Sequence, residues 1–324
     1  MANAIHSSNW WAARLATETA YGSGSGAVAN TPVKLSALVG MAYPRTRGSD
    51  MYPIQKVMKE ELDSQDDGQM GGEIVTSGWE SKEGTRDEYV QDKFYWTKLL
   101  ALYAAGQGKV PPSYAIHWQD HIRAGSADDN LRYESFGCYI KELSFVIPQN
   151  SGDKSGFPYW SITDACYETW QEVSDAEVVD SIIKVPWLTT TAAAMVTQAS
   201  FSIGGNIVNN IEAEMKFTTA FDETKEAGDD GLKFPYYTNM DVEFTCKFRS
   251  YAEYKTLVQN ILKDTGSDAY YTVKINTGLT TTFIQVTNMM PTEGDFARIP
   301  EKGMVSYEMT FKQTSTSVIS EESS

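Results

Sequence analysis

Apolar and polar residues alternate along many short stretches of this chain, and that alternation limits the possible folds more than any other feature. In residues 210–217, NIEAEMKF, every second residue is apolar, and residues 241–248, DVEFTCKF, show the same pattern. Successive side chains of a β-strand point to opposite faces, so this period predicts strands with one buried and one polar face. Further strands are predicted within residues 113–120, 136–147, 157–170, 270–278, 281–289 and 303–313.

Two segments have a helical period instead. Residues 92–106 place Tyr95, Leu99, Leu102 and Tyr103 on one face, with Asp92 as the expected N-cap and Gly106 as the C-cap. Residues 250–266 begin with a capping box and carry an apolar stripe of their own. Each helix is followed by three predicted strands, so this order occurs twice. We interpret the recurrence as an internal duplication, with two unrelated α+β domains as the alternative.

The predicted fold class is mainly β (α+β): two similar lobes, each an antiparallel β-sandwich or half-barrel with one packed helix. A chain of 324 residues exceeds one small core, which also favours two domains. We expect an N-terminal arm with extended loops over residues 1–70, a first lobe over 71–180 and a second lobe over 181–315. A flexible tail is expected over residues 316–324.

The composition excludes several kinds of partner. The chain has 43 acidic and 27 basic residues, a formal charge of −16, and such a surface repels phosphates. Ordinary binding to nucleic acids or anionic membranes is therefore not expected. No apolar run approaches the ~20 residues of a membrane span, and the N-terminus lacks the pattern of a secretory signal. The three cysteines have no CxxC pair and are expected to be free thiols in a reducing cytoplasm.

The sequence offers little for catalysis. The best metal-like group is His117, Asp120 and His121, but the strand pattern there separates the two histidines by about 13 Å. The run YGSGSG lacks the preceding strand and the Lys-Ser/Thr end of a phosphate loop. We expect no enzymatic activity, no catalytic or metal-binding residues and no cofactor. A metal-dependent hydrolase that uses the two histidines is the alternative.

Four segments carry a resemblance to a known family. Residues 18–22, ETAYG, are similar to an E-x-x-x-G opening before an arm, and FGCYIKELSFVI at 136–147 is a glycine-cysteine strand after a helix and a strand. Residues 201–217, FSIGGNIVNNIEAEMKF, look like a first hairpin, and residues 283–313 look like a closing hairpin. Together these segments resemble the tail tube proteins (major tail proteins) of long-tailed DNA phages and viruses.

The resemblance implies a structural protein that polymerises into stacked rings and forms the hollow virion tail tube, a β-barrel through which double-stranded DNA is delivered. Its partners would be further copies of itself, the tape measure, tail terminator and tail-tip proteins, and genomic DNA that passes without specific binding. Two lobes per chain would make a ring of three chains with pseudo-sixfold symmetry, and a ring of six chains is the alternative. The protein would be made and assembled in the host cytoplasm and reside in the virion tail. A two-lobed β-sandwich binding module, an adhesin or a carbohydrate binder, is the alternative function.

Two sets of site residues follow from this implied function. Glu212, Glu214, Asp241 and Glu243 share the polar side of two apolar strands, and we expect them to face the lumen of the tube. Phe221, Phe234, Tyr236 and Tyr237 lie at the ends of the long connection between those strands. Large apolar groups in a loop often mark contact sites, so we expect this loop to contact the neighbouring ring.

Overall fold

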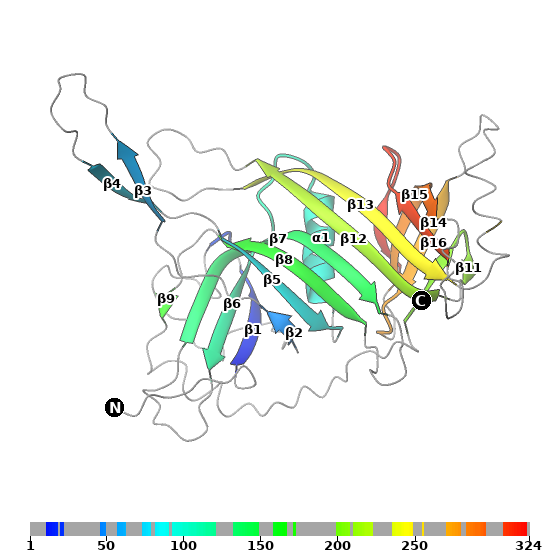
Figure 1. The fold of residues 1–324 in the computed structure, drawn as a ribbon, viewed down its shortest axis with the longest axis horizontal. Helices are drawn as coiled ribbons and strands as arrows, with labels where there is room; N and C mark the ends of the chain where they lie inside the picture. Colours follow the sequence, from blue (N-terminus) through cyan, green and yellow to red (C-terminus); the bar gives the residue numbers. More distant parts are fainter. Residues whose placement is uncertain are drawn as a thin grey trace, which may run out of the picture.

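The computed structural model describes residues 11–18, 20–22, 46–49, 57–62, 73–78, 82–90, 93–120, 132–148, 158–166, 171–172, 199–207, 210–222, 235–248, 255, 270–279, 283–295 and 307–322. Within these ranges the protein is mainly β, with seventeen strands and one helix, α1 (Phe94–Ala105) (Figure 1). The expectation of a mainly β fold is therefore confirmed.

Fifteen of the strands form one open antiparallel sheet with a larger and a smaller part. The larger part, here called the large sheet, contains β1 (Trp11–Thr17), β2 (Thr46–Ser49), β5 (Lys82–Tyr89), β6 (Tyr114–Asp120), β7 (Arg132–Ile147), β8 (Tyr159–Cys166), β9 (Gln171–Glu172), β12 (Asn210–Asp222), β13 (Tyr236–Phe248) and β16 (Tyr307–Lys312). The smaller part, the small sheet, contains β10 (Ser200–Ile203), β11 (Asn206–Ile207), β14 (Tyr271–Asn276) and β17 (Ile319–Glu322). The long strand β15 (Phe283–Asp295) belongs to both parts, because residues 283–289 pair with β14 and β17 whereas residues 290–295 pair with β16.

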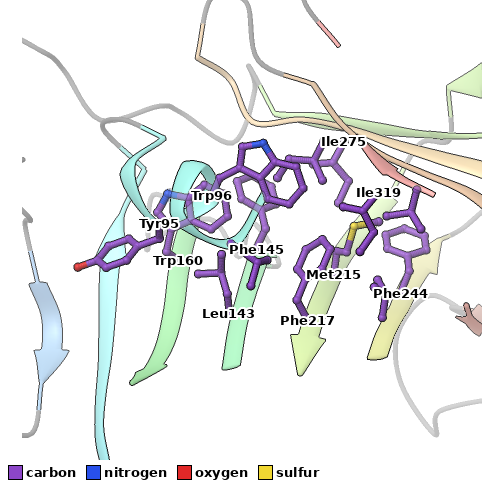
Figure 2. Close-up of a cluster of buried hydrophobic side chains, with 14 of the residues drawn as sticks. Tyr95, Trp96, Leu143, Phe145, Trp160, Met215, Phe217, Phe244, Ile275 and Ile319 are labelled. Carbon is purple, nitrogen blue, oxygen red and sulfur yellow. The ribbon is translucent and has the colours of Figure 1, made fainter. Parts of the chain in front are cut away.

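Helix α1 and the small sheet cover the apolar face of the large sheet, and the core lies between these layers (Figure 2). From the helix, Trp96 packs against Phe217 of β12, with ring centroids 5.4 Å apart. From the small sheet, Phe201 packs against Phe244 of β13 at 5.0 Å. The buried side chains form one cluster with members from β7 and β8 as well as from β12 to β17. The alternation seen in the sequence therefore corresponds to real burial, with the apolar positions of β12 and β13 facing inward.

Helix α1 follows its predicted face but not its predicted N-terminus. Tyr95, Leu99 and Leu102 are buried, and the backbone N–H of Gly106 donates to the carbonyl of Tyr103 at the C-terminal end, as expected. The N-cap residue is Lys93, and its side chain makes no capping hydrogen bond. The predicted cap, Asp92, lies outside the described residues, as does the predicted second helix at 250–266 except for Lys255, which is helical.

The strand order of the first half of the chain recurs in the second half. The first half has the order β1-β6-β7-β8-β5-β2, and the second half has the order β10-β14-β15-β16-β13-β12. In each half, the third strand of this order also pairs with a short strand that comes last in the chain: β9 pairs with β7, and β17 pairs with β15. In chain order, α1 falls between β5 and β6, and the segment that includes the helical residue Lys255 falls between β13 and β14.

The irregularities of strand pairing recur at matching places. Three register shifts in the first half have counterparts in the second, namely Thr46/Gly48 with Asn210/Glu212, Tyr114/Ile116 with Tyr271/Val273, and Ile140/Glu142 with Pro291/Glu293. A β-bulge bends its strand and increases the local twist, so shared bulges give the two groups of strands the same local shape. The two groups therefore agree in backbone detail as well as in order.

The two groups of strands join directly in the large sheet. The second part of β7 lies between β8 and β12, and its pairing with β12 runs from Ile147 opposite Ala213 to Glu142 opposite Thr218. Because β7 comes from the region expected as the first lobe and β12 from the second, the sheet is continuous across the predicted boundary. The boundary itself stays a prediction.

A buried carboxylate holds the bend in β7. Gly137 has a φ of 62°, and its N–H donates to Oε1 of Glu18 at 3.0 Å. Oε2 of the same residue accepts from the N–H of Gly22 at 3.2 Å and from the hydroxyl of Ser113. Three donors from three parts of the chain satisfy this buried charge, which would otherwise be costly. The glutamate and glycine of the E-x-x-x-G pattern are thus Glu18 and Gly22, bonded to each other.

Strands also occur in the segments expected as an arm and as a tail. Within residues 1–70, β1 pairs with β6 and β2 pairs with β5, so these two strands belong to the large sheet. Within 316–324, β17 pairs with β15 and buries Ile319, so residues 319–322 form an edge strand of the small sheet. The remaining two strands, β3 (Val57–Leu62) and β4 (Glu73–Gly78), form a separate hairpin that projects from the body in Figure 1.

Candidate functional surface

The four predicted lumen residues lie together on the face of the large sheet that turns away from the core. Glu212 and Glu214 alternate with the buried Ala213 and Met215 of β12, and Asp241 and Glu243 alternate with buried residues of β13 in the same way. The two strands are neighbours, with Glu214 opposite Thr245 and Glu243 opposite Lys216. The structure therefore brings these carboxylates onto one solvent-facing surface, here called the polar face.

Lysines of β13 and β16 pair with two of these acids. Lys247 contacts Glu212 at 3.2 Å and Glu308 at 3.5 Å, and Lys312 contacts Glu243 at 3.6 Å. Burial alone would lower the pKa of Lys247, but the hydrogen bonds and charges of Glu212 and Glu308 outweigh it and raise that pKa. Exposed pairs of this kind contribute only about 0–1 kcal/mol each, so they set the charge pattern more than the stability.

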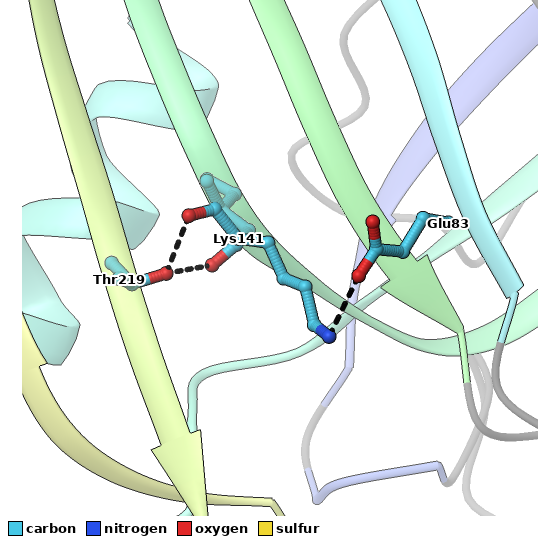
Figure 3. Close-up of polar contacts among 4 residues, drawn as sticks. Glu83, Lys141 and Thr219 are labelled. Atoms are coloured by element: carbon cyan, nitrogen blue, oxygen red, sulfur yellow. Dashed lines mark hydrogen bonds and ion pairs between the residues drawn. The ribbon is translucent and has the colours of Figure 1, made fainter.

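The polar face continues across the first half of the chain. Lys216 of β12 contacts Glu142 of β7 at 2.8 Å. Lys141 of β7 contacts Glu83 of β5 at 2.8 Å, as Figure 3 shows. Across β5, β7, β12, β13 and β16 the face carries eight acids and four lysines: Glu83, Asp87, Glu142, Glu212, Glu214, Asp241, Glu243, Glu308, Lys141, Lys216, Lys247 and Lys312. The acids outnumber the bases two to one, so the face repels polyanions such as nucleic acids.

A threonine positions Lys141 on this face. The register shift between Ile140 and Glu142 makes Lys141 the extra residue of a β-bulge in the pairing with β8. The hydroxyl of Thr219 lies 2.7 Å from the carbonyl oxygen of Ile140 and 2.9 Å from that of Lys141 (Figure 3). It therefore supplies a hydrogen-bond donor to the backbone at the bulge. Sequence reasoning missed Thr219, because a polar residue in an apolar position of β12 gives no sign of the bulge on another strand.

The second predicted set, the loop contact residues, is divided by the structure. Phe221 lies one residue before the end of β12 and packs on the core beside Tyr139, with ring centroids 4.7 Å apart. Tyr237 is buried on β13. Tyr236 is 47% exposed, so it is the described member of the set that could reach another molecule. Phe234 lies outside the described residues. The strands extend further into this connection than the sequence suggested.

The structure describes only part of the group of residues considered for chemistry. His117 and Asp120 lie in β6, and His121 falls outside the described residues. Among the residues that the structure describes, no three His, Cys, Asp or Glu side chains are grouped as a metal site would require. The three cysteines are free and buried, and Cys138 lies opposite Cys166 on the neighbouring strand.

Sequence comparisons with known proteins do not assign this chain to a family. No model of a known protein family matches this chain, and no curated protein matches its sequence. In the described part of the chain, no helix is both long and apolar enough to cross a membrane.

Proposed function

We propose that this chain is a structural protein of a viral tail tube, a subunit that polymerises into stacked rings around a channel for double-stranded DNA. The observation that supports this most is a long sheet, continuous through both halves, whose apolar face is covered and whose described polar side chains are accessible to solvent. A tube wall needs both faces, because one must pack on the rest of the subunit and the other must line the channel. The E-x-x-x-G residues also support the proposal, since the motif that carried the resemblance has a structural role in Glu18 and Gly22.

The ring would be built from two tube lobes per chain. The first half contributes the neighbouring strands β2, β5, β8 and β7, and the second half contributes their counterparts β12, β13, β16 and β15. These groups of strands would be the two similar lobes of the proposed duplication, each expected to carry one packed helix. Three chains would then supply six similar lobes in a ring with pseudo-sixfold symmetry, and six chains would be needed if one lobe lay outside the wall.

The polar face would line the lumen. Duplex DNA carries about one negative charge per 1.7 Å of its axis, so a basic wall would bind it and an acidic wall lets it slide. Glu214 and Asp241 are exposed and form no ion pair among the described side chains, so they keep the face negative where Glu212 and Glu243 contact lysines. Tyr236 is the described candidate for contact with the next ring.

Electron microscopy of the purified, concentrated protein tests the proposal. We expect long hollow fibres of constant diameter, with rings whose image symmetry is threefold at high detail and close to sixfold at low detail. A monomer at all concentrations, with no fibres, would favour the two-lobed binding module instead. Rings with true sixfold symmetry would keep the tube and reject the ring of three chains.

A further inference from the structure

Cys138 of β7 and Cys166 of β8 lie directly opposite each other on neighbouring antiparallel strands. Both are buried thiols that are not joined by a disulfide. Burial, and then a hydrogen bond between the two thiols, raise the pKa of Cys138 above its ordinary value, so the side chains are in contact. Opposite residues of an antiparallel pair have Cβ atoms about 4.5–5.5 Å apart, and a disulfide needs about 3.5–4.5 Å. A closing movement of about 1 Å therefore separates this thiol pair from a covalent bond.

The fold does not require two cysteines at this place. The register that β7 and β8 share with β15 and β16 puts Met289 and Gln313 at the positions equivalent to Cys138 and Cys166. The third cysteine, Cys246 of β13, lies across from an alanine on β12 and a methionine on β16. The pair is thus a local feature of the first half, and Cys246 is a buried thiol of the same sheet that can serve as its control.

The two thiols of the pair differ in how they meet an oxidant. Cys138 is fully buried, whereas Cys166 keeps 5% of its surface exposed. The thiolate is the reactive form of cysteine, and burial disfavours that form at Cys138. Oxidation therefore begins at Cys166, and the small exposed surface there selects a small oxidant such as hydrogen peroxide.

We propose that Cys138 and Cys166 are a peroxide-sensitive thiol pair that forms a disulfide between β7 and β8. The disulfide ties the bend of β7 to its neighbouring strand once the chain leaves a reducing environment. A bond made by closing two strands toward each other is strained, so thiol reductants reverse it. The reaction takes place within one chain and does not depend on the proposed function.

Hydrogen peroxide supplies the two electron vacancies that the disulfide needs. The Cys166 thiolate attacks one peroxide oxygen and the O–O bond breaks, which leaves a sulfenic acid and a hydroxide that takes up the proton lost by Cys166. The Cys138 sulfur then attacks the Cys166 sulfur, and the S–O bond breaks. The departing hydroxide leaves as water with the proton of the Cys138 thiol. In sum, two thiols are oxidised to one disulfide and one peroxide is reduced to two waters.

Peptide mass spectrometry of the full, folded and reduced chain tests the proposal. The chain is exposed to hydrogen peroxide, catalase stops the reaction, and iodoacetamide in denaturant alkylates the remaining thiols before digestion without reductant. Trypsin separates the three cysteines into residues 133–141, 155–184 and 234–247, so each thiol is read independently. We expect the first two peptides to be joined and lighter than their sum by two hydrogen atoms. Cys246 should stay alkylated, and dithiothreitol should restore alkylation at the other two.

Two variants sharpen the reading, with circular dichroism to check that each has folded. Cys246→Ala should leave the joined peptides unchanged. Cys166→Ala removes the sulfur that reacts first, so Cys138 should stay alkylated after peroxide. Three thiols that all stay alkylated in the native chain would overturn the proposal, as would an oxidised Cys166 beside an alkylated Cys138. Joined peptides that include Cys246, or that link two copies of the chain, would overturn it as well, because they would show pairing without regard to the strand register.

Discussion

β7 and β15 have the same bend, but different chemistry holds it in each strand. In β7 the residue with positive φ is Gly137, which directly precedes Cys138, the partner of Tyr114. In β15 it is Asn288, with a φ of 53°, which directly precedes Met289, the partner of Tyr271. The backbone departs from regular strand geometry at equivalent points, whereas the two residue types differ.

The surroundings of the two bends differ as well. The N–H of Gly137 is bonded to the buried carboxylate of Glu18. The carbonyl of Asn288 accepts from the hydroxyls of Thr314 at 2.9 Å and Ser317 at 3.0 Å, and its side-chain amide donates to the carbonyl of Thr316. In the first half, the carboxylate of Glu18, just after β1, hydrogen-bonds the backbone at the bend. In the second half, neutral hydroxyls of a local turn do so. The shape of the strand is the shared feature, and the means of satisfying its backbone varies.

The largest expected loss of stability comes from removing the carboxylate that supports the bend in the first half. Glu18→Ala removes the acceptor of the Gly22 and Gly137 N–H groups and of the Ser113 hydroxyl. Unsatisfied buried groups cost about 1–3 kcal/mol each, so we expect a loss of roughly 3–5 kcal/mol in the free energy of unfolding. Urea unfolding followed by circular dichroism measures it. Asn288→Ala, which removes one side-chain bond and adds backbone strain, is the matched variant and should cost about 1–2 kcal/mol. Equal losses would show that the carboxylate is not the main support of the bend.

The second expected effect is a pH dependence that belongs to the first half. Lys98 is buried, and its Nζ donates to the carbonyl of Ser113 at 2.9 Å. Burial lowers the pKa of Lys98 from 10.5 to about 8, although the charge of Glu18 opposes this. Between these two values the unfolded chain binds more protons than the folded one, so the free energy of unfolding contributed by this group rises with pH. We expect a rise of about 2–3 kcal/mol over that interval, at no more than about 1.4 kcal/mol per pH unit.

The variant Lys98→Met isolates this contribution. Burial also raises the pKa of the Cys138 and Cys246 thiols above 9.0, and those groups reduce stability above that pH because the unfolded thiols ionise first. Both proteins share that loss, so the difference between their unfolding free energies reports Lys98 alone. A difference that does not change between pH 7 and pH 10 would contradict the assignment.

The smallest expected losses of stability come from replacing the single residue with positive φ at each bend. Gly137→Ala puts a side chain at positive φ and brings its Cβ to 3.3 Å from the ring of Tyr21, which should cost about 1–2 kcal/mol. Asn288→Gly keeps the backbone conformation and loses one bond to Thr316, for about 0.5–1 kcal/mol. Thermal unfolding of the two variants compares them directly. If Gly137→Ala were the milder change, the bend in β7 would not depend on glycine.

Much of the sheet could be predicted from the sequence because burial on one face imposes an alternation that is visible residue by residue. β12 and β13 show this best, and the four acids expected on their polar side are there. The inward face of α1 was predictable for the same reason, since Tyr95, Leu99 and Leu102 recur at the helical period. The lumen role of the acids stays a prediction, because it depends on other copies of the chain.

Contacts between distant parts of the chain could not be predicted in this way. Glu18 bonds to Gly137, far along the sequence, and no local pattern shows that a glutamate beside an arm is buried. Strand β17 gave a weak signal because Ile319 is its single buried residue. The sequence places Tyr237 in a predicted loop, because no local pattern shows that β13 already begins at Tyr236. Tyr237 is instead a strand residue whose ring packs beside Phe221. Each miss concerns what lies across from a residue in the fold.

The sharing of β15 between two sheets has a mechanical consequence. The strand pairs with β14 and β17 over residues 283–289 and with β16 over residues 290–295, so one length of covalent backbone is hydrogen-bonded in both layers. Opening that strand releases the amides of β14 and β16 in a single event, and the two neighbours form one cooperative unit. A load applied along the large sheet passes through this backbone into the small sheet, so the layers stretch together and do not slide past one another.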